Sequence, residues 1–159
     1  MEVQIFTDGA CSGNPGKGGY GAVLIYGEHR KEISQGFKLT TNNRMEILGV
    51  LEAFKCLKKT CDVVLCSDSK YVIDALVQGW AKKWRENKWM RTKRDKALNV
   101  DLWEPLLLEI EKHNVTYKWV KGHAGHPENE RCDFLAVSAY NSCNLTDDTG
   151  YINSNESRD

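Results

Sequence analysis

The segment DVVLCSDSKYVIDAL, residues 62–76, indicates the fold class. Residues 62–66 form a largely apolar run, which is typical of a parallel strand buried on both faces. The run ends just before Asp68, and Ser69 can then cap a helix whose apolar residues recur at helical spacing. A strand that leads directly into a helix is the repeating unit of a parallel α/β sheet.

The sequence on both sides of this segment continues the alternation of strands and helices. A glycine-rich stretch at 9–21 reads as a turn region, and 22–39 reads as an antiparallel hairpin. We expect strands at 3–7, 22–26, 33–39, 62–66 and 115–120, and helices at 44–59, after Ser69, at 99–113 and at 127–140. This order predicts an α/β fold in which an antiparallel hairpin joins parallel strands.

Length and charge exclude several classes of protein. The chain has 159 residues, enough for one domain, and its 22 basic and 22 acidic residues exclude a uniformly basic nucleic-acid binder. It has no secretory signal and no apolar run long enough to span a membrane, so we expect a cytoplasmic protein without membrane contact. The six cysteines form no C-x-x-C pair, which indicates buried thiols in a reducing compartment.

Four carboxylates lie at positions where they could form a catalytic or metal-binding site. Asp8 and Asp68 each follow an apolar strand, Glu46 lies near the start of a helix, and Asp133 lies about two turns into the last helix. If these groups converged they would repel one another, and hard divalent cations such as Mg²⁺ or Mn²⁺ would relieve the repulsion. Each carboxylate alone is equally a turn, cap or surface residue, so spacing by itself leaves convergence open.

Longer motifs favour a shared site for the four carboxylates over separate turn, cap or surface roles. They are TDG at 7–9, GNPG at 13–16, GGYG at 18–21, TTNNRME at 40–46, SDS at 67–69 and WVKGHAGHPENERCD at 119–133. Through these motifs the sequence closely resembles bacterial type 1 ribonuclease H over residues 2–145. The resemblance implies the ribonuclease H-like fold, a five-stranded mixed sheet of hairpin and parallel strands flanked by helices.

The resemblance also implies an activity and a metal site. It implies an endonuclease that hydrolyses the RNA strand of RNA–DNA hybrids with two Mg²⁺ ions, for which Mn²⁺ can substitute, and leaves 5′-phosphate and 3′-hydroxyl ends. Asp8, Glu46, Asp68 and Asp133 match the metal-binding carboxylates, and His123 matches a histidine on a mobile loop. We expect a monomer.

Substrate-binding residues are predicted around these carboxylates. The candidates on the glycine-rich turn and before Glu46 are Cys11, Gly13, Asn14, Asn42 and Asn43. Thr41 and Asn99 match positions that in the family contact a DNA phosphate. Lys70 replaces a common Gln and Leu39 a common Arg, so this chain departs from the bacterial pattern at two contacts.

Residues 80–96, here called the basic segment, combine eight Lys or Arg with two acidic residues and three tryptophans. Clustered positive charge with aromatic rings suits a phosphate backbone, and the segment resembles the family's basic protrusion. The candidate contacts are Trp80, Lys82, Lys83, Trp84, Lys88 and Trp89. The alternative is a solvated helix with tryptophans packed beneath it, at least Trp80 and Trp84, which are four residues apart.

We expect a single catalytic domain at 1–143 and a polar, flexible tail at 144–159. GKGGYG at 16–21 formally matches a dinucleotide-binding motif, but the residues that follow read as a strand rather than a helix. Two other hypotheses stay open: a non-catalytic hybrid-binding module, and another nuclease of the same fold such as a resolvase.

Overall fold

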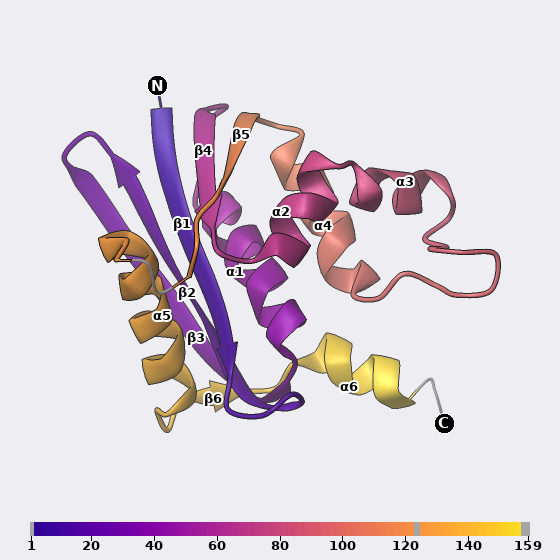
Figure 1. The fold of residues 1–159 in the computed structure, drawn as a ribbon. Helices are drawn as coiled ribbons and strands as arrows, with labels where there is room; N and C mark the ends of the chain where they lie inside the picture. Colours follow the sequence, from indigo (N-terminus) through magenta and orange to yellow (C-terminus); the bar gives the residue numbers. More distant parts are fainter. Residues whose placement is uncertain (1, 123–124, 157–159) are drawn as a thin grey trace.

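The structure is a computed structural model that describes residues 2–122 and 125–156. Its centre is one mixed sheet with the strand order β5-β4-β1-β2-β3-β6 (Figure 1). β1, β2 and β3 are antiparallel neighbours, β4 and β5 run parallel to β1, and β6 runs parallel to β3. The strands are β1 (Glu2–Cys11), β2 (Gly16–Tyr26), β3 (His29–Thr40), β4 (Asp62–Ser67), β5 (Asn114–Trp119) and β6 (Leu145–Thr146).

Helices cover both faces of this sheet. α5 packs on β1 and β2 from one side, whereas α1 packs on the same strands from the other and is itself covered by α4. The helices are α1 (Asn42–Lys55), α2 (Lys70–Val77), α3 (Trp80–Glu86), α4 (Val100–Ile110), α5 (Pro127–Tyr140) and α6 (Thr149–Glu156). Within the described ranges, no helix is both long and apolar enough to cross a membrane.

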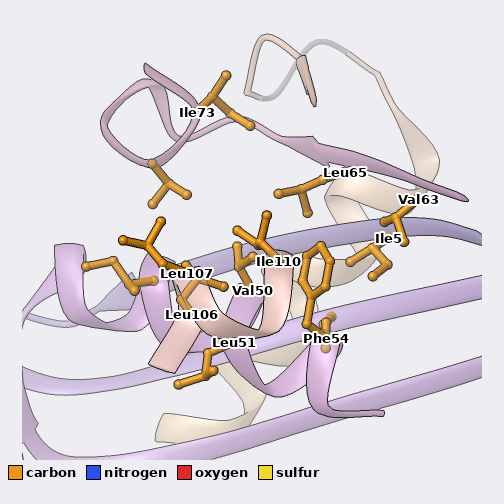
Figure 2. Packing of buried hydrophobic residues seen from close by; sticks show 14 of the residues in the cluster. Ile5, Val50, Leu51, Phe54, Val63, Leu65, Ile73, Leu106, Leu107 and Ile110 are labelled. Atoms are coloured by element: carbon orange, nitrogen blue, oxygen red, sulfur yellow. The ribbon is translucent and has the colours of Figure 1, made fainter. Parts of the chain in front are cut away.

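The main core lies between the sheet and the α1–α4 layer. Ile5 and Leu65 from neighbouring strands, Val50 and Phe54 from α1, and Leu106 from α4 are all fully buried there (Figure 2). Burying each such side chain stabilises the fold by roughly 1.5–3 kcal/mol. This packing fixes α1 against β1 and so determines where the residues at the start of α1 lie.

The glycine-rich stretch at 9–21 differs from its predicted turn. β1 continues to Cys11 and β2 begins at Gly16, so the turn between them is only four residues long and contains a cis Asn14–Pro15 bond. Glycine composition suggested a loop, but several of these glycines lie within strands because helices approach the sheet there more closely than a side chain would allow.

The sheet has one strand more than predicted, and part of the predicted C-terminal tail has regular secondary structure. Leu145 and Thr146 pair in parallel with Gly36 and Phe37 as β6, a sixth strand, and residues 149–156 form α6. A two-residue strand has no periodicity to detect. The segment is held instead by Asp148, which is 6% exposed and contacts residues distant in the sequence.

Candidate active site

Three of the predicted carboxylates converge at one edge of the sheet. Asp8, Glu46 and Asp68 each offer an oxygen, and these oxygens lie within 4.8 Å of one another. β1 and β4 are parallel with Thr7 opposite Ser67, so the residues that follow, Asp8 and Asp68, lie side by side. Spacing alone left this convergence open, and the pairing of β1 with β4 produces it.

Gly9 allows Glu46 to join the two aspartates. A Cβ atom at position 9 would lie 2.5 Å from the backbone nitrogen of Glu46 and 2.6 Å from the carbonyl carbon of Met45. Only a residue without a side chain therefore lets the start of α1 rest directly on β1. This close approach places the Glu46 carboxylate, which is buried, beside Asp8.

Gly21 performs the same role for α5, which carries Asp133. Gly21 is the partner of Asp8 across the β1–β2 ladder, and a Cβ atom there would lie 2.4 Å from the carbonyl oxygen of Cys132. The Cys132 thiol also hydrogen-bonds the carbonyl oxygen of Phe6 at 3.2 Å. Asp133 lies outside the three-carboxylate cluster, yet it is near enough for its charge to raise the pKa of Asp8.

Burial and repulsion by neighbouring carboxylates favour the protonated forms of Asp8 and Glu46. Burial, followed by the charges of Asp68 and Asp133, raises the pKa of Asp8 from 3.8 to about 8. Burial, followed by the charges of Asp8 and Asp68, raises the pKa of Glu46 well above its ordinary value. One hydrogen bond opposes this trend, because the Gly9 amide donates to Asp8 Oδ1 at 2.9 Å.

The cluster fits a hard divalent cation. Glu46 Oε2 is buried and has no hydrogen-bond partner among the described residues. A buried carboxylate oxygen without a partner is costly, and a cation would satisfy it while neutralising the repulsion. All three groups in the cluster offer oxygen, which favours Mg²⁺ or Mn²⁺ over zinc.

His123, the predicted loop histidine, lies outside the described residues. Gly122, the residue before it, is so close to the cluster that a Cβ atom there would be 2.8 Å from Asp68 Oδ2. The described chain therefore reaches the carboxylates at Gly122, and the role of His123 stays a prediction.

Trp119 was not predicted as a site residue. Its indole Nε1 donates to the backbone oxygen of Asp68 at 3.0 Å, and the ammonium group of Lys70 lies 5.1 Å from its ring centroid. The ring is 43% exposed. The sequence signal was present, since Trp119 begins the long motif that ends at Asp133, but nothing in the sequence showed that β5 ends beside Asp68.

The candidate substrate residues near α1 also support local structure. Thr41 caps α1 by accepting a hydrogen bond from the Arg44 amide at 3.3 Å. Asn14 Oδ1 accepts from the Asn42 amide at 3.1 Å, which ties the β1–β2 turn to the start of α1. Asn14 is exposed and Thr41 is half-buried. The structural role of these residues is observed, and their contact with substrate stays a prediction.

The other candidates on this turn and helix lie close by. Cys11 ends β1 and is half-buried, and Gly13 is exposed in the turn. Asn43 is exposed in the first turn of α1. Asn99 precedes α4 in a left-handed conformation, and its side chain accepts a hydrogen bond from Arg44 Nη1 at 3.3 Å.

The tryptophans of the basic segment divide between packing and exposure. Trp84 packs edge-on against the buried Trp103 with centroids 6.3 Å apart, and Trp89 is half-buried against the same core. Trp80 is 43% exposed. The inward-packing alternative therefore holds for Trp84 and Trp89.

The lysines of the basic segment face solvent. Lys82, Lys83 and Lys88 are all exposed. The chain after α3 extends away from the body of the protein before it returns to α4, as Figure 1 shows. The positive charge is therefore displayed on a projection where a long anionic ligand could reach it.

A mixed sheet with carboxylates gathered at the ends of two parallel strands defines an α/β protein with a candidate divalent-metal centre. The sequence model of one family, described as RNase H, matches residues 1–141. The chain belongs to this RNase H family.

Individual proteins agree with the family assignment. The chain is 61% identical over 144 residues to Ribonuclease H of Desulforamulus reducens, covering 91% of each chain. It is 57% identical over 148 residues to Ribonuclease HI of Synechocystis sp., covering 92% of each. Among solved structures, LC9-RNase H1, a type 1 RNase H with the type 2 active-site motif, superposes with a TM-score of 0.79 and 32% identity over 88% of this chain and 72% of that one.

Proposed function

We propose that this member of the RNase H family hydrolyses the RNA strand of RNA–DNA hybrids and leaves 5′-phosphate and 3′-hydroxyl ends. The observation that carries the proposal is the convergence of Asp8, Glu46 and Asp68, with Glu46 Oε2 buried and unpartnered among the described residues. A non-catalytic hybrid-binding module would have no reason to keep three mutually repelling carboxylates within 4.8 Å.

The proposed cofactor is a pair of Mg²⁺ ions, which Mn²⁺ can replace. When bound, two such ions activate the attacking water and stabilise the leaving 3′ oxygen. Asp8 lies within the cluster of Glu46 and Asp68 and also feels the charge of Asp133, so these four carboxylates would hold the ions.

The substrate-binding residues around the carboxylate cluster would position the scissile phosphate over it. The carboxylates are fixed by strand pairing and by two close helix contacts, so little reorganisation is needed during reaction. His123 would hold or move a proton near the reacting phosphate, since imidazole titrates near neutral pH.

Recognition of the hybrid would come from surfaces on both sides of the cluster. Asn14, Asn43 and the neighbouring turn offer amide donors and acceptors that can contact sugar hydroxyls. The exposed lysines of the basic segment would contact phosphates, and these contacts provide affinity without reading sequence.

The proposal includes the broader organisation of the protein. Residues 1–143 would form the catalytic domain, the protein would act as a monomer, and the cytoplasm would be its compartment.

A cleavage assay tests the proposed function. Four end-labelled duplexes are compared: an RNA–DNA hybrid, double-stranded RNA, double-stranded DNA and a DNA duplex with a single embedded ribonucleotide. We expect Mg²⁺-dependent cuts within the RNA strand of the hybrid and none in EDTA. Equal cleavage of double-stranded DNA would favour a resolvase-like nuclease, and tight binding of the hybrid without any cleavage would favour the binding module.

A further inference from the structure

A groove of about 700 Å³ lies beside the predicted substrate residues, and α6 forms one of its walls. Asn43 and Asn99 line the groove from the start of α1 and from the residue before α4. Tyr151 and Asn153 line it from α6. The family match ends at residue 141, so this wall is built from sequence beyond it.

Ion pairs of the buried Arg44 hold α6 in this place. Asp148 accepts hydrogen bonds from Arg44 Nε at 2.7 Å and from the Thr40 hydroxyl at 2.6 Å. The same Arg44 binds Asp101 through two further contacts, at 2.6 and 2.8 Å. Figure 1 shows the resulting position of α6 beside the start of α1.

The approach of α6 to this network is very close. A Cβ atom at Gly150 would lie 1.9 Å from Asp101 Oδ2 and 2.5 Å from Arg44 Nη2. α6 therefore packs directly, at Gly150, against the ion pairs that join Asp148, Arg44 and Asp101. Because Arg44 is only 3% exposed, its charge is used within the protein and is not available to a ligand.

The groove connects two surfaces already assigned to the substrate. At one side Asn43 stands three residues before Glu46 of the carboxylate cluster. At the other side the lining includes Lys96, the last residue of the basic segment. A hybrid that contacts Asn43 and Lys96 would therefore reach the groove that both residues line.

The chemistry of the lining suits a nucleic-acid backbone. Amide and hydroxyl side chains commonly contact phosphate oxygens and sugars and position the duplex without reading its sequence. The ion-pair network of Arg44, Asp101 and Asp148 carries one net negative charge, which the exposed Lys96 offsets. The groove thus presents hydrogen-bonding side chains beside the apolar surface of Ala97, Leu98 and Val100, and its charges balance.

We propose that α6 is part of the hybrid-binding surface and that Asn153 and Tyr151 contact the sugar–phosphate backbone away from the scissile bond. This inference rests on the proposed function for the identity of the ligand. It assigns a substrate contact to the C-terminal segment, which the sequence had predicted to be a flexible tail.

Opposite charges introduced at Asn153 test the inference without removing any described contact of the fold. Asn153 is exposed, so both Asn153→Lys and Asn153→Glu are expected to fold. Hybrid binding is measured by fluorescence anisotropy across a range of salt concentrations, with Ca²⁺ in place of Mg²⁺ to prevent turnover. Thr146, exposed in β6 of the same segment and outside the groove, receives the same pair of substitutions as a control for net charge.

We expect Asn153→Glu to weaken hybrid binding about 3–10-fold and Asn153→Lys to strengthen it, with the salt slope steepened by about 0.7–0.9 for one added phosphate contact. The Thr146 variants should stay within about twofold of wild type, since Thr146 does not line the groove and salt screens an exposed charge there. Circular dichroism confirms folding of each variant.

Failure of this inference and failure of the proposed function give different results. If wild type cleaves hybrids but the Asn153 variants behave like the Thr146 variants, the groove does not contact substrate and the inference is wrong. If wild type binds hybrids without cleaving them and the Asn153 variants still shift affinity in opposite directions, the inference stands and the proposed activity is wrong.

Discussion

Asp8→Asn should stabilise the metal-free protein while removing its activity. Asp8 is buried among carboxylates, and its pKa rises from 3.8 to about 8 in the fold. Keeping it ionised above that pH costs on the order of 5 kcal/mol, because each pH unit between the two values is worth 1.36 kcal/mol. Asparagine carries no charge and can still accept the hydrogen bond from the Gly9 amide.

The sign of the pH dependence follows from the raised pKa. A carboxyl group with a folded-state pKa above its unfolded value contributes stability that is complete below about pH 4 and is lost as pH rises towards about 8. We therefore expect wild type and variant to be similar in stability near pH 4. Above about pH 8 the variant should be more stable by about 2–4 kcal/mol, less than the full cost because the amide is also desolvated.

Urea denaturation followed by circular dichroism measures this difference in EDTA and again in millimolar Mg²⁺. Mg²⁺ should stabilise wild type by mass action and so reduce the gap. Asp147→Asn is the control, since Asp147 is 57% exposed and its ion pair with Lys38 is a surface contact of little energetic value. A variant that is no more stable than wild type at about pH 9 in EDTA would refute the repulsion argument.

Three further predictions concern positioning, affinity and proton transfer. Gly21→Ala adds a methyl group 2.4 Å from the Cys132 carbonyl oxygen, so α5 must move outwards. Unfolding measurements should show a loss of about 1–3 kcal/mol in stability, and kcat should fall because Asp133 moves with the helix. An unchanged kcat would contradict the placement of Asp133. His123→Ala should slow turnover by roughly 10²–10⁴-fold and leave calorimetric Mg²⁺ affinity intact, and a large loss of that affinity would instead make His123 a metal ligand. Neutralising three exposed lysines of the basic segment together should raise KM and leave kcat nearly unchanged. It should also flatten the salt dependence of binding by about 0.7–0.9 log unit per lost phosphate contact. An unchanged slope would show that the basic segment is solvated and does not bind the hybrid. These lysines are Lys82, Lys83 and Lys88.

Much of the fold could be predicted because its signals are local. The apolar run at 62–66, the Ser69 cap and Pro127 as the first residue of a helix all appear in the structure where the sequence placed them. Each depends on residues within a few positions of one another, which is the range over which periodicity and capping act.

The candidate site depended on tertiary structure in a different way. The motifs named Asp8, Glu46 and Asp68, but their convergence comes from the parallel pairing of β1 with β4 and from the contact of α1 with Gly9. The glycines at 9–21 led to the wrong prediction of a long turn. Composition cannot distinguish a glycine at which the chain turns from a glycine in a strand on which a helix packs closely.

The sequence by itself determined the alternation of strands and helices, the residue types of the metal site and the basic segment. Only the tertiary structure decided that residues 145–156 form a strand and a helix, because their place rests on Asp148 meeting Arg44, more than a hundred positions away in the chain. An aspartate in a polar stretch carries no local signal for such a contact. The stabilising effect of Asp148 depends on the buried guanidinium group of Arg44, and only the folded chain brings the two side chains within 2.7 Å of each other.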